Sequence, residues 1–433
     1  MKSSAIISAA GIAAPSLIGA AAEPKAAAAG NAPSGKVITS APMLQNFAPD
    51  SIGVAFCVDT LVNPYVKIST NPDLSGARLC KSGGFRVTEL ADKIAQVRIR
   101  GLKPATKYYY RIGADTITYN NGHSMKKTGT VEDPRTYSFT TAGAALDGSF
   151  CVINDTHVKW PAFEASVNLI SKLAPSCVIW NGDAISSSET MEMQQQTFFN
   201  PEITKKDYAC EIPFLLCPGN HENRGMANRH LERAWMFRCN EERSSRDWDL
   251  GRNFAFRLGD IALIGLDTAE DKVDENPLYA GLFNSAAYRE AQTKWLADTL
   301  KRKEIKSAKH IVAFCHIPLF DDDPTQNPGD IHPNDTDPRY STDYAHWQRT
   351  CGNMWTPLLQ KAGCRVIISG HQHRYRVIKP SGSRKWTQII GGGPNFGHDK
   401  RFPTVIKGHC DNGRLKITVY RADTGSVIEE FEF

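Results

Sequence analysis

The pattern of hydrophobic and polar residues along this chain of 433 residues changes near residue 143. Between residues 37 and 142, short runs that alternate between apolar and polar positions are separated by turn-forming residues, which is typical of β-strands. Strands repeated in this way, without helical segments between them, indicate an all-β sandwich. The runs that predict strands are residues 51–58, 65–68, 94–99, 108–112 and 136–140.

A local signature within this region is more specific. Leu102, Pro104, Thr106 and Tyr108 stand at the spacing of a tyrosine corner, in which a phenol hydroxyl ties a strand to the loop before it. Residues 37–142 therefore resemble a fibronectin type III or similar immunoglobulin-like domain.

After residue 143, β-rich runs alternate with segments of helical periodicity, which predicts an α/β or α+β domain over residues 143–433. A hairpin at 254–258 and 261–267 indicates that its sheets are mixed. Strands are predicted at residues 149–154, 177–181, 213–217, 310–315, 365–369, 388–391, 405–408, 415–420 and 427–431, and helices at 162–173, 286–303 and 353–362.

The first segment has the layout of a secretory signal. Lys2 precedes an apolar stretch that ends in small residues at Ala22, and we expect residues 1–22 to be removed on export to the periplasm, cell surface or medium. A membrane anchor is the alternative, but Pro15 and several glycines and serines make the stretch a poor span. Residues 23–36 are rich in Ala, Gly, Pro and Ser and predict a flexible linker. No later stretch is apolar enough to span a bilayer.

Composition and charge exclude some classes of protein. The hydrophobic fraction of 41% is sufficient for a packed core, and 51 basic against 46 acidic residues leave a net charge of only +5. So small a net charge does not indicate a nucleic-acid-binding protein.

Five of the eleven cysteines lie in or beside predicted strands and are expected in the core. The other six are disulfide candidates that the sequence cannot pair: Cys57, Cys80, Cys210, Cys239, Cys351 and Cys410.

Five predicted strands run directly into residue types that bind metals. Because the carboxyl ends of strands in an open α/β sheet meet at one crevice, these clusters are expected to converge. Residues two apart in an extended segment also point the same way, so each D-x-H or H-x-H pair can face one centre. The clusters are Asn154-Asp155-Thr156-His157, Gly182-Asp183, Gly219-Asn220-His221-Glu222, Cys315-His316 and Gly370-His371-Gln372-His373.

In this order, D-x-H, G-D, G-N-H-E, an isolated H and G-H-x-H resemble the motif set of calcineurin-like metallophosphoesterases over residues 149–375. The order of a β domain followed by this motif set is similar to the domain layout of purple acid phosphatases. The resemblance implies a two-layer β-sandwich flanked by helices, which holds two divalent or trivalent metal ions. It implies Asp155, His157, Asp183 and His373 as ligands of one metal, and Asp183, Asn220, His316 and His371 as ligands of the other, with Asp183 bridging.

Two cations about 3.5–4 Å apart can clamp a phosphoryl group and acidify a bridging water. We expect the resulting hydroxide to attack phosphorus while His221, which matches the family's catalytic histidine, assists the leaving group. Mixed imidazole, carboxylate and amide ligands favour Fe, Mn or Zn. Ser186 stands where purple acid phosphatases have a tyrosine ligand, and His157 where they have glycine, so the iron–tyrosine colour is expected to be absent.

The expected function is an exported phosphomonoesterase, similar to acid phosphatases, that acts on a phosphorylated small molecule. A phosphodiesterase using the same site is one alternative, and a noncatalytic surface-binding protein on a degenerate scaffold is another.

Outside the main motifs, Arg224 could pair with phosphate oxygens, although a surface arginine is the simpler interpretation. Glu222 either orients a neighbour or is a solvated or helix-start carboxylate. Weaker candidates are Asp321–Asp323, His332, His398 and the glycine-rich segment 391–395.

Overall fold

The computed structural model describes residues 36–81, 90–199, 207–237, 250–320, 338–396 and 400–433, with the side chains of 338–346 left out. The predicted signal segment, nearly all of the predicted linker, Asp321–Asp323, His332 and His398 lie outside the described residues. Within them, no helix is long and apolar enough to cross a membrane.

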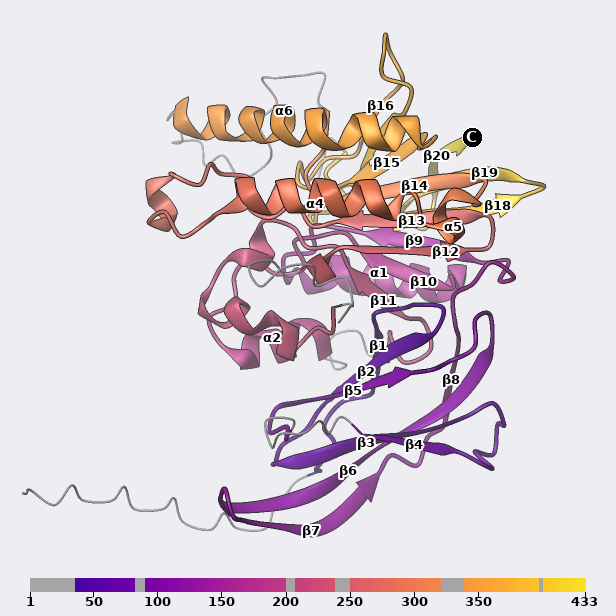
Figure 1. Ribbon diagram of the computed structural model, residues 1–433, viewed down its shortest axis with the longest axis vertical. Helices are drawn as coiled ribbons and strands as arrows, with labels where there is room; N and C mark the ends of the chain where they lie inside the picture. Colours follow the sequence, from indigo (N-terminus) through magenta and orange to yellow (C-terminus); the bar gives the residue numbers. More distant parts are fainter. Residues whose placement is uncertain (1–35, 82–89, 200–206, 238–249, 321–337, 397–399) are drawn as a thin grey trace, which may run out of the picture.

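The N-terminal region consists of two antiparallel sheets that face each other, as the strand pattern predicts (Figure 1). Buried aliphatic and aromatic side chains such as Val54, Ile99 and Tyr110 fill the space between them. One sheet contains β1 (Met43–Gln45), β2 (Ser51–Cys57) and β5 (Ile94–Arg100); the other contains β3 (Val62–Ser69), β4 (Arg78–Lys81), β6 (Lys107–Asn121), β7 (Ser124–Glu132) and β8 (Tyr137–Thr140).

The tyrosine corner predicted from the sequence is present. The hydroxyl of Tyr108 accepts a hydrogen bond of 2.9 Å from the backbone N–H of Lys103. Leu102 is buried in the core of the sandwich beside Tyr108. The phenol therefore ties strand β6 to the loop before it, as in immunoglobulin-like domains.

The N-terminal sandwich is joined to the rest of the chain by strand pairing, which the sequence did not indicate. Strand β1 lies parallel to β11 (Phe214–Leu216) at Gln45 and Phe214, so β1, β2 and β5 extend a sheet of nine strands. The amide of Gln45 strengthens the joint, because its Nε2 donates to the carbonyl of Ala234 and its Oε1 accepts from Met236 N–H. The predicted boundary near residue 143 stays a prediction.

The second region confirms the expected pair of packed sheets with helices on their outer faces (Figure 1). The nine-stranded sheet also contains β9 (Ser149–Ile153), β10 (Cys177–Trp180), β18 (Thr404–Asp411), β19 (Arg414–Arg421) and β20 (Val427–Glu432). The six-stranded sheet contains β12 (Phe254–Leu258), β13 (Ile261–Leu266), β14 (His310–Cys315), β15 (Val366–Ser369), β16 (Arg376–Ile378) and β17 (Thr387–Ile390).

Side-chain alternation along the strands decides which layer each residue enters. On β9, Phe150 points into the core between the sheets and meets Phe314 edge to face, with ring centroids 5.5 Å apart. Cys151 points to the other side and packs under helix α1 (Trp160–Leu173). The outer face of the six-stranded sheet is covered by α4 (Ser285–Thr299) and α6 (Pro338–Lys361), as Figure 1 shows.

Some predicted helices differ from those observed. The helix predicted at 353–362 is wrong at its start, because α6 begins at Pro338, where a proline is tolerated in the first turn. Trp347, Cys351, Trp355 and Leu359, spaced by four residues, all belong to the core under α6 and continue its apolar stripe beyond the predicted start. The helix predicted at 286–303 ends at Thr299, before the short α5 (Lys303–Lys306), and α2 (Met191–Phe199) was not predicted.

The described cysteines are free thiols, including Cys57, Cys80, Cys210, Cys351 and Cys410 from the set of disulfide candidates. None of these five candidates is paired in a disulfide. The sixth candidate, Cys239, lies outside the described residues. Cys57 and Cys351 are buried, so they contribute small apolar side chains to the core.

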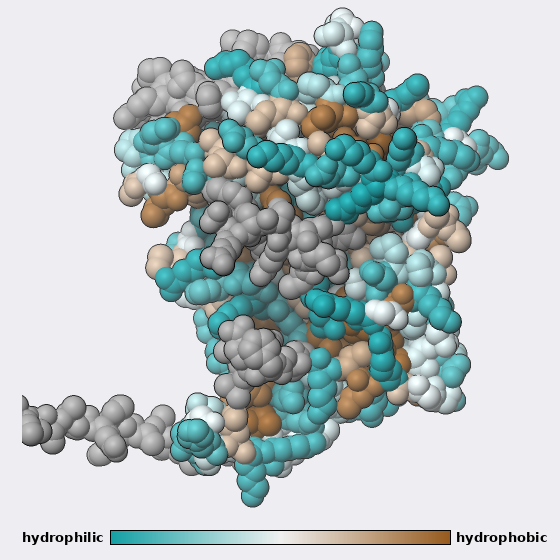
Figure 2. All heavy atoms as spheres, viewed as in Figure 1, coloured by the Kyte–Doolittle hydropathy of each residue, from teal (hydrophilic) through white to brown (hydrophobic). Residues whose placement is uncertain are grey.

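The face of the molecule in Figure 2 is mostly hydrophilic, with smaller hydrophobic patches.

Candidate metal centre

The predicted metal-ligand residues follow strands whose carboxyl ends open on one edge of the two sheets. β9, β10 and β11 are parallel neighbours in one sheet, and β13, β14 and β15 are parallel neighbours in the other. Backbone hydrogen bonds join the loops after these strands, for example from Asp155 N–H to the Gly182 carbonyl at 3.0 Å and from Gly370 N–H to the His316 carbonyl at 2.8 Å.

The backbone of these loops is unusual. Five predicted ligands have φ between 43° and 71°, a region that residues other than glycine seldom occupy. Such conformations cost about 1–3 kcal/mol each and persist where the surrounding structure imposes them, most often at functional sites. The five residues are Asp155, His157, Asp183, His371 and His373.

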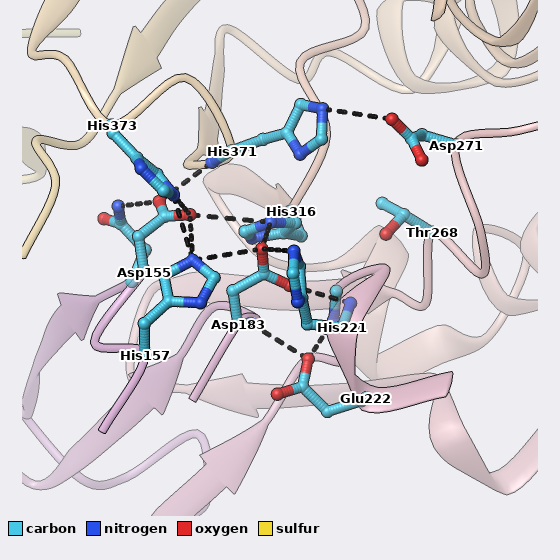
Figure 3. A network of polar contacts seen from close by, with 12 residues as sticks. Asp155, His157, Asp183, His221, Glu222, Thr268, Asp271, His316, His371 and His373 are labelled. Carbon is cyan, nitrogen blue, oxygen red and sulfur yellow. Dashed lines mark hydrogen bonds and ion pairs between the residues drawn. The ribbon is translucent and has the colours of Figure 1, made fainter. Parts of the chain in front are cut away.

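One group of potential ligands consists of Asp155, His157, Asp183 and His373, whose ligand atoms all lie within 4.8 Å of one another. His373 Nε2 lies 3.2 Å from Asp155 Oδ1, and His157 Nε2 lies 3.5 Å from Asp183 Oδ2. The Nε2 atoms of His157 and His373 face each other at 2.9 Å (Figure 3). Two imidazole nitrogens directed at the same space are in a position to ligate one cation there.

A second group consists of Asp183, His316 and His371. His316 Nε2 lies 3.0 Å from Asp183 Oδ2 and 3.7 Å from Asp155 Oδ1. Asp183 belongs to both groups, which is the position expected of a bridging carboxylate. The two groups together are consistent with a dinuclear metal site.

Several buried polar atoms at this centre lack a hydrogen-bond partner among the described residues. They include both side-chain polar atoms of Asn220, a residue that is 1% exposed, and also Asp155 Oδ1 and His316 Nε2, whose contacts with neighbouring ligand residues do not have hydrogen-bond geometry. Buried polar atoms are normally satisfied, so these orphaned donors and acceptors need an explanation. Metal ions would accept the lone pairs of the carboxylate, amide oxygen and imidazole, and the donor set suits Fe, Mn or Zn. The residues present therefore fit the implied metals.

Two motif glycines are required by close approach of the backbone to these side chains. A Cβ atom on Gly182, whose φ is 81°, would lie 2.4 Å from the ring of His316. A Cβ atom on Gly219 would lie 2.4 Å from Asp183 Oδ1 and 2.6 Å from His316 Cδ2. These glycines thus allow the loops after β10 and β11 to pack against the candidate ligands.

Burial and charge set the protonation states of the histidines. Burial lowers the pKa of His157 and of His371 to about 4 each, so both are neutral and have lone pairs to donate at neutral pH. Burial acts in the same direction on His316, but the charges of Asp183 and Asp155 outweigh it and raise the pKa of His316 to about 10. The excess negative charge that holds this proton would also stabilise a bound cation.

His221 lies beside the two groups, with its Nε2 3.9 Å from Asp183 Oδ2 (Figure 3). Its Nδ1 lies 2.5 Å from the carbonyl of Ser186, and because a carbonyl only accepts, Nδ1 carries the proton. Its backbone N–H donates to Asp183 Oδ1 at 3.0 Å. These bonds orient the ring with Nε2 toward the centre, where a substrate would be held.

Glu222 orients its neighbours, which decides between the two roles considered for it. Its carboxylate is fully buried and accepts backbone hydrogen bonds from Asp183 at 2.9 Å, Ala184 at 2.9 Å and Gly219 at 2.7 Å. The side chain therefore holds the loops after β10 and β11 together. Both loops carry candidate ligands, so Glu222 maintains the spacing between them.

Sequence reasoning missed other residues that support the histidines. Asp271 Oδ2 lies 3.7 Å from His371 Nε2, and Figure 3 shows the two side chains directed at each other. Ser186 Oγ lies 3.2 Å from His157 Nδ1, and the carbonyl of Asn181 lies 2.8 Å from His316 Nδ1. Such partners fix the tautomer and ring orientation of metal-binding histidines. No motif in the sequence links Asp271 to His371.

The glycine-rich segment at 391–395 also packs against the centre. Asn154 Nδ2 donates to the carbonyl of Gly392 at 2.8 Å and to Asp155 Oδ2 at 2.5 Å. This segment thus supports the loop that carries Asp155.

Comparisons with known proteins agree with this geometry. The family model described as calcineurin-like phosphoesterase matches residues 148–375. Serine/threonine-protein phosphatase CPPED1 of Mus musculus is 25% identical over 213 residues, 49% of this chain and 58% of the mouse protein. Probable purple acid phosphatase 20 of Arabidopsis thaliana is 21% identical over 337 residues, 76% of this chain and 66% of the plant protein. The chain thus spans less than two thirds of either relative.

A solved structure shows the same fold over most of the chain. The purple acid phosphatase PPD1 from yellow lupin (Lupinus luteus) seeds superimposes with a TM-score of 0.60 at 13% identity, and the match covers 92% of this chain and 75% of the lupin chain.

Proposed function

Because the chain belongs to the calcineurin-like phosphoesterase family and is a metallophosphoesterase, we propose that it hydrolyses phosphomonoesters of small molecules. The observation that carries this proposal is the sharing of one buried carboxylate, Asp183, by two groups of metal-binding side chains, with His221 Nε2 3.9 Å away. This arrangement provides two adjacent cation positions and a proton-carrying group within reach of both.

The candidate ligands divide between two cations. Asp155, His157 and His373 would hold one and Asn220, His316 and His371 the other, with Asp183 common to both. When bound, two such ions supply positive charge that polarises a phosphoryl group and lowers the pKa of a water between them.

The chain's own residues orient the substrate and move a proton. The bond from Nδ1 to the Ser186 carbonyl fixes the ring of His221, so that when Nε2 is protonated as well, in the imidazolium form, that proton can pass to the leaving oxygen. General-acid assistance of this kind contributes about 10²–10⁴-fold to a rate. Glu222 keeps the loops of Asp183 and His221 in register, because it accepts hydrogen bonds from Asp183 and Gly219.

Phosphodiester hydrolysis is the second candidate. It is favoured by His157, which completes a D-x-H ligand set that diesterases of this superfamily also use. Rates on 4-nitrophenyl phosphate and bis(4-nitrophenyl) phosphate, measured at equal metal content, separate the two candidates. We expect faster hydrolysis of the monoester, and a marked preference for the bis-ester would overturn the proposal.

We also propose that the protein is exported, on the strength of the positive, apolar and small-residue pattern of residues 1–22. Mass spectrometry of the protein recovered from its source checks this, because export predicts a mature N-terminus near residue 23. A retained N-terminal segment in a cytoplasmic fraction would contradict it. Metal analysis of the same material should find Fe, Mn or Zn.

A further inference from the structure

Arg224 is held beside the metal centre by a fixed partner. Its Nε and Nη2 donate to the two carboxylate oxygens of Glu270 at 3.0 Å and 2.9 Å, and Nη2 also lies 3.5 Å from Asp271 Oδ1. The Arg224 side chain is 19% exposed and that of Glu270 is fully buried. A bidentate pair of this kind fixes the plane of the guanidinium as well as its position.

The remaining nitrogen of the guanidinium points at His221. Arg224 Nη1 lies 2.8 Å from His221 Nε2, which in turn lies 3.9 Å from the carboxylate oxygen of Asp183 shared by both ligand groups. Because the proton of this imidazole is on Nδ1, Nε2 accepts a hydrogen bond from the arginine. Arg224 Nη1 and His221 Nε2 therefore lie together at the edge of the candidate metal centre.

The guanidinium of Arg224 stays protonated and positively charged. Burial opposes this charge, but the hydrogen bonds and negative charge of Glu270 outweigh burial and raise the pKa of Arg224. The face of Tyr279 also lies 5.8 Å from the guanidinium. Glu270 thus satisfies Nε and Nη2, whereas Nη1 is directed at His221 at the edge of the candidate metal centre.

We propose that Arg224 is a substrate-binding residue that selects phosphomonoesters over diesters. Nη1 exchanges His221 Nε2 for a terminal phosphoryl oxygen of the substrate, while Glu270 keeps the rest of the guanidinium in place. A monoester has three terminal oxygens and a charge of about −1.5 to −2 near neutral pH, whereas a diester has two such oxygens and one charge. The added donor therefore stabilises the bound monoester through the terminal oxygen that a diester lacks. This inference rests on the proposed function.

The test compares Arg224→Gln and Arg224→Lys with Arg229→Gln, a matched control at an exposed arginine of the same segment. For Arg224→Gln, we expect KM for 4-nitrophenyl phosphate to rise about 10- to 100-fold, the range of one hydrogen bond to a charged group. KM for the bis-ester should rise less than about threefold. Lysine keeps the charge without the bidentate anchor, so Arg224→Lys should recover part of the loss. The control should match the wild type on both substrates.

A binding measurement gives an independent readout. Inorganic phosphate should raise the melting temperature of the metal-loaded wild type and of Arg229→Gln, and this shift should shrink in Arg224→Gln. If Arg224→Gln raises KM equally for both esters and leaves phosphate binding unchanged, the role of Arg224 is overturned. If Arg224→Gln is poorly folded, the same result with Arg224→Lys overturns it. If the wild type cleaves no monoester, the proposed function fails, and phosphate binding alone then decides the role of Arg224.

Discussion

The substitution Glu222→Gln tests whether one buried carboxylate maintains the metal centre. In the structure, one carboxylate oxygen accepts from the N–H groups of Asp183 and Gly219, and the other accepts from Ala184 N–H. Glutamine retains only one acceptor oxygen, so in its better orientation it keeps two bonds and turns an NH₂ group toward Ala184 N–H. At least one bond to a charged group is lost, at a cost of about 1.5–3 kcal/mol, and two donors are left facing each other.

This loss acts on the loops that carry Asp183 and Asn220, so we expect metal affinity to fall about 10- to 100-fold, as for other supports of metal ligands. Titration against a competing chelator measures the affinity, and thermal unfolding of the apo protein measures the structural cost. The matched control is Glu232→Gln, because that side chain is 56% exposed. If Glu222→Gln keeps both the metal affinity and the melting temperature of the wild type, the reasoning about the carboxylate clamp is wrong.

Three further predictions concern the centre and the N-terminal sandwich. Asp183→Ala should reduce kcat by more than about 10³-fold with an unchanged far-UV circular dichroism spectrum, because both ligand groups lose their common member; an unchanged rate would exclude the two-metal mechanism. The purified metal-loaded protein should show no strong visible charge-transfer band, since Ser186 bonds to His157 and offers no phenolate; a strong band would contradict this ligand assignment. Tyr108→Phe should lower the melting temperature by removing a bond worth about 0.5–1.5 kcal/mol while leaving kcat unchanged; equal melting temperatures would show that the tyrosine corner adds no stability.

The sequence alone was sufficient where short-range patterns decide the outcome. The strand predicted at residues 149–154 is observed as β9 (Ser149–Ile153), and Cys151, which was expected in the core, is buried there. The tyrosine corner needs only the spacing from Lys103 to Tyr108, and both belong to one local segment. Metal-ligand residue types at strand ends also predicted a common site, because parallel strands bring their carboxyl ends to one edge.

Other features depend on contacts between segments distant along the chain, and only the tertiary structure decided them. Glu270 meets Arg224 and Asp271 meets His371 because the loop after β13 crosses the ends of the neighbouring strands, a path that no local pattern encodes. The joint between Gln45 and Phe214 likewise depends on how two separately predicted regions dock. Local side-chain preferences therefore determined the strands and the donor atoms of this protein, whereas the packing of remote loops determined which charged groups orient those donors.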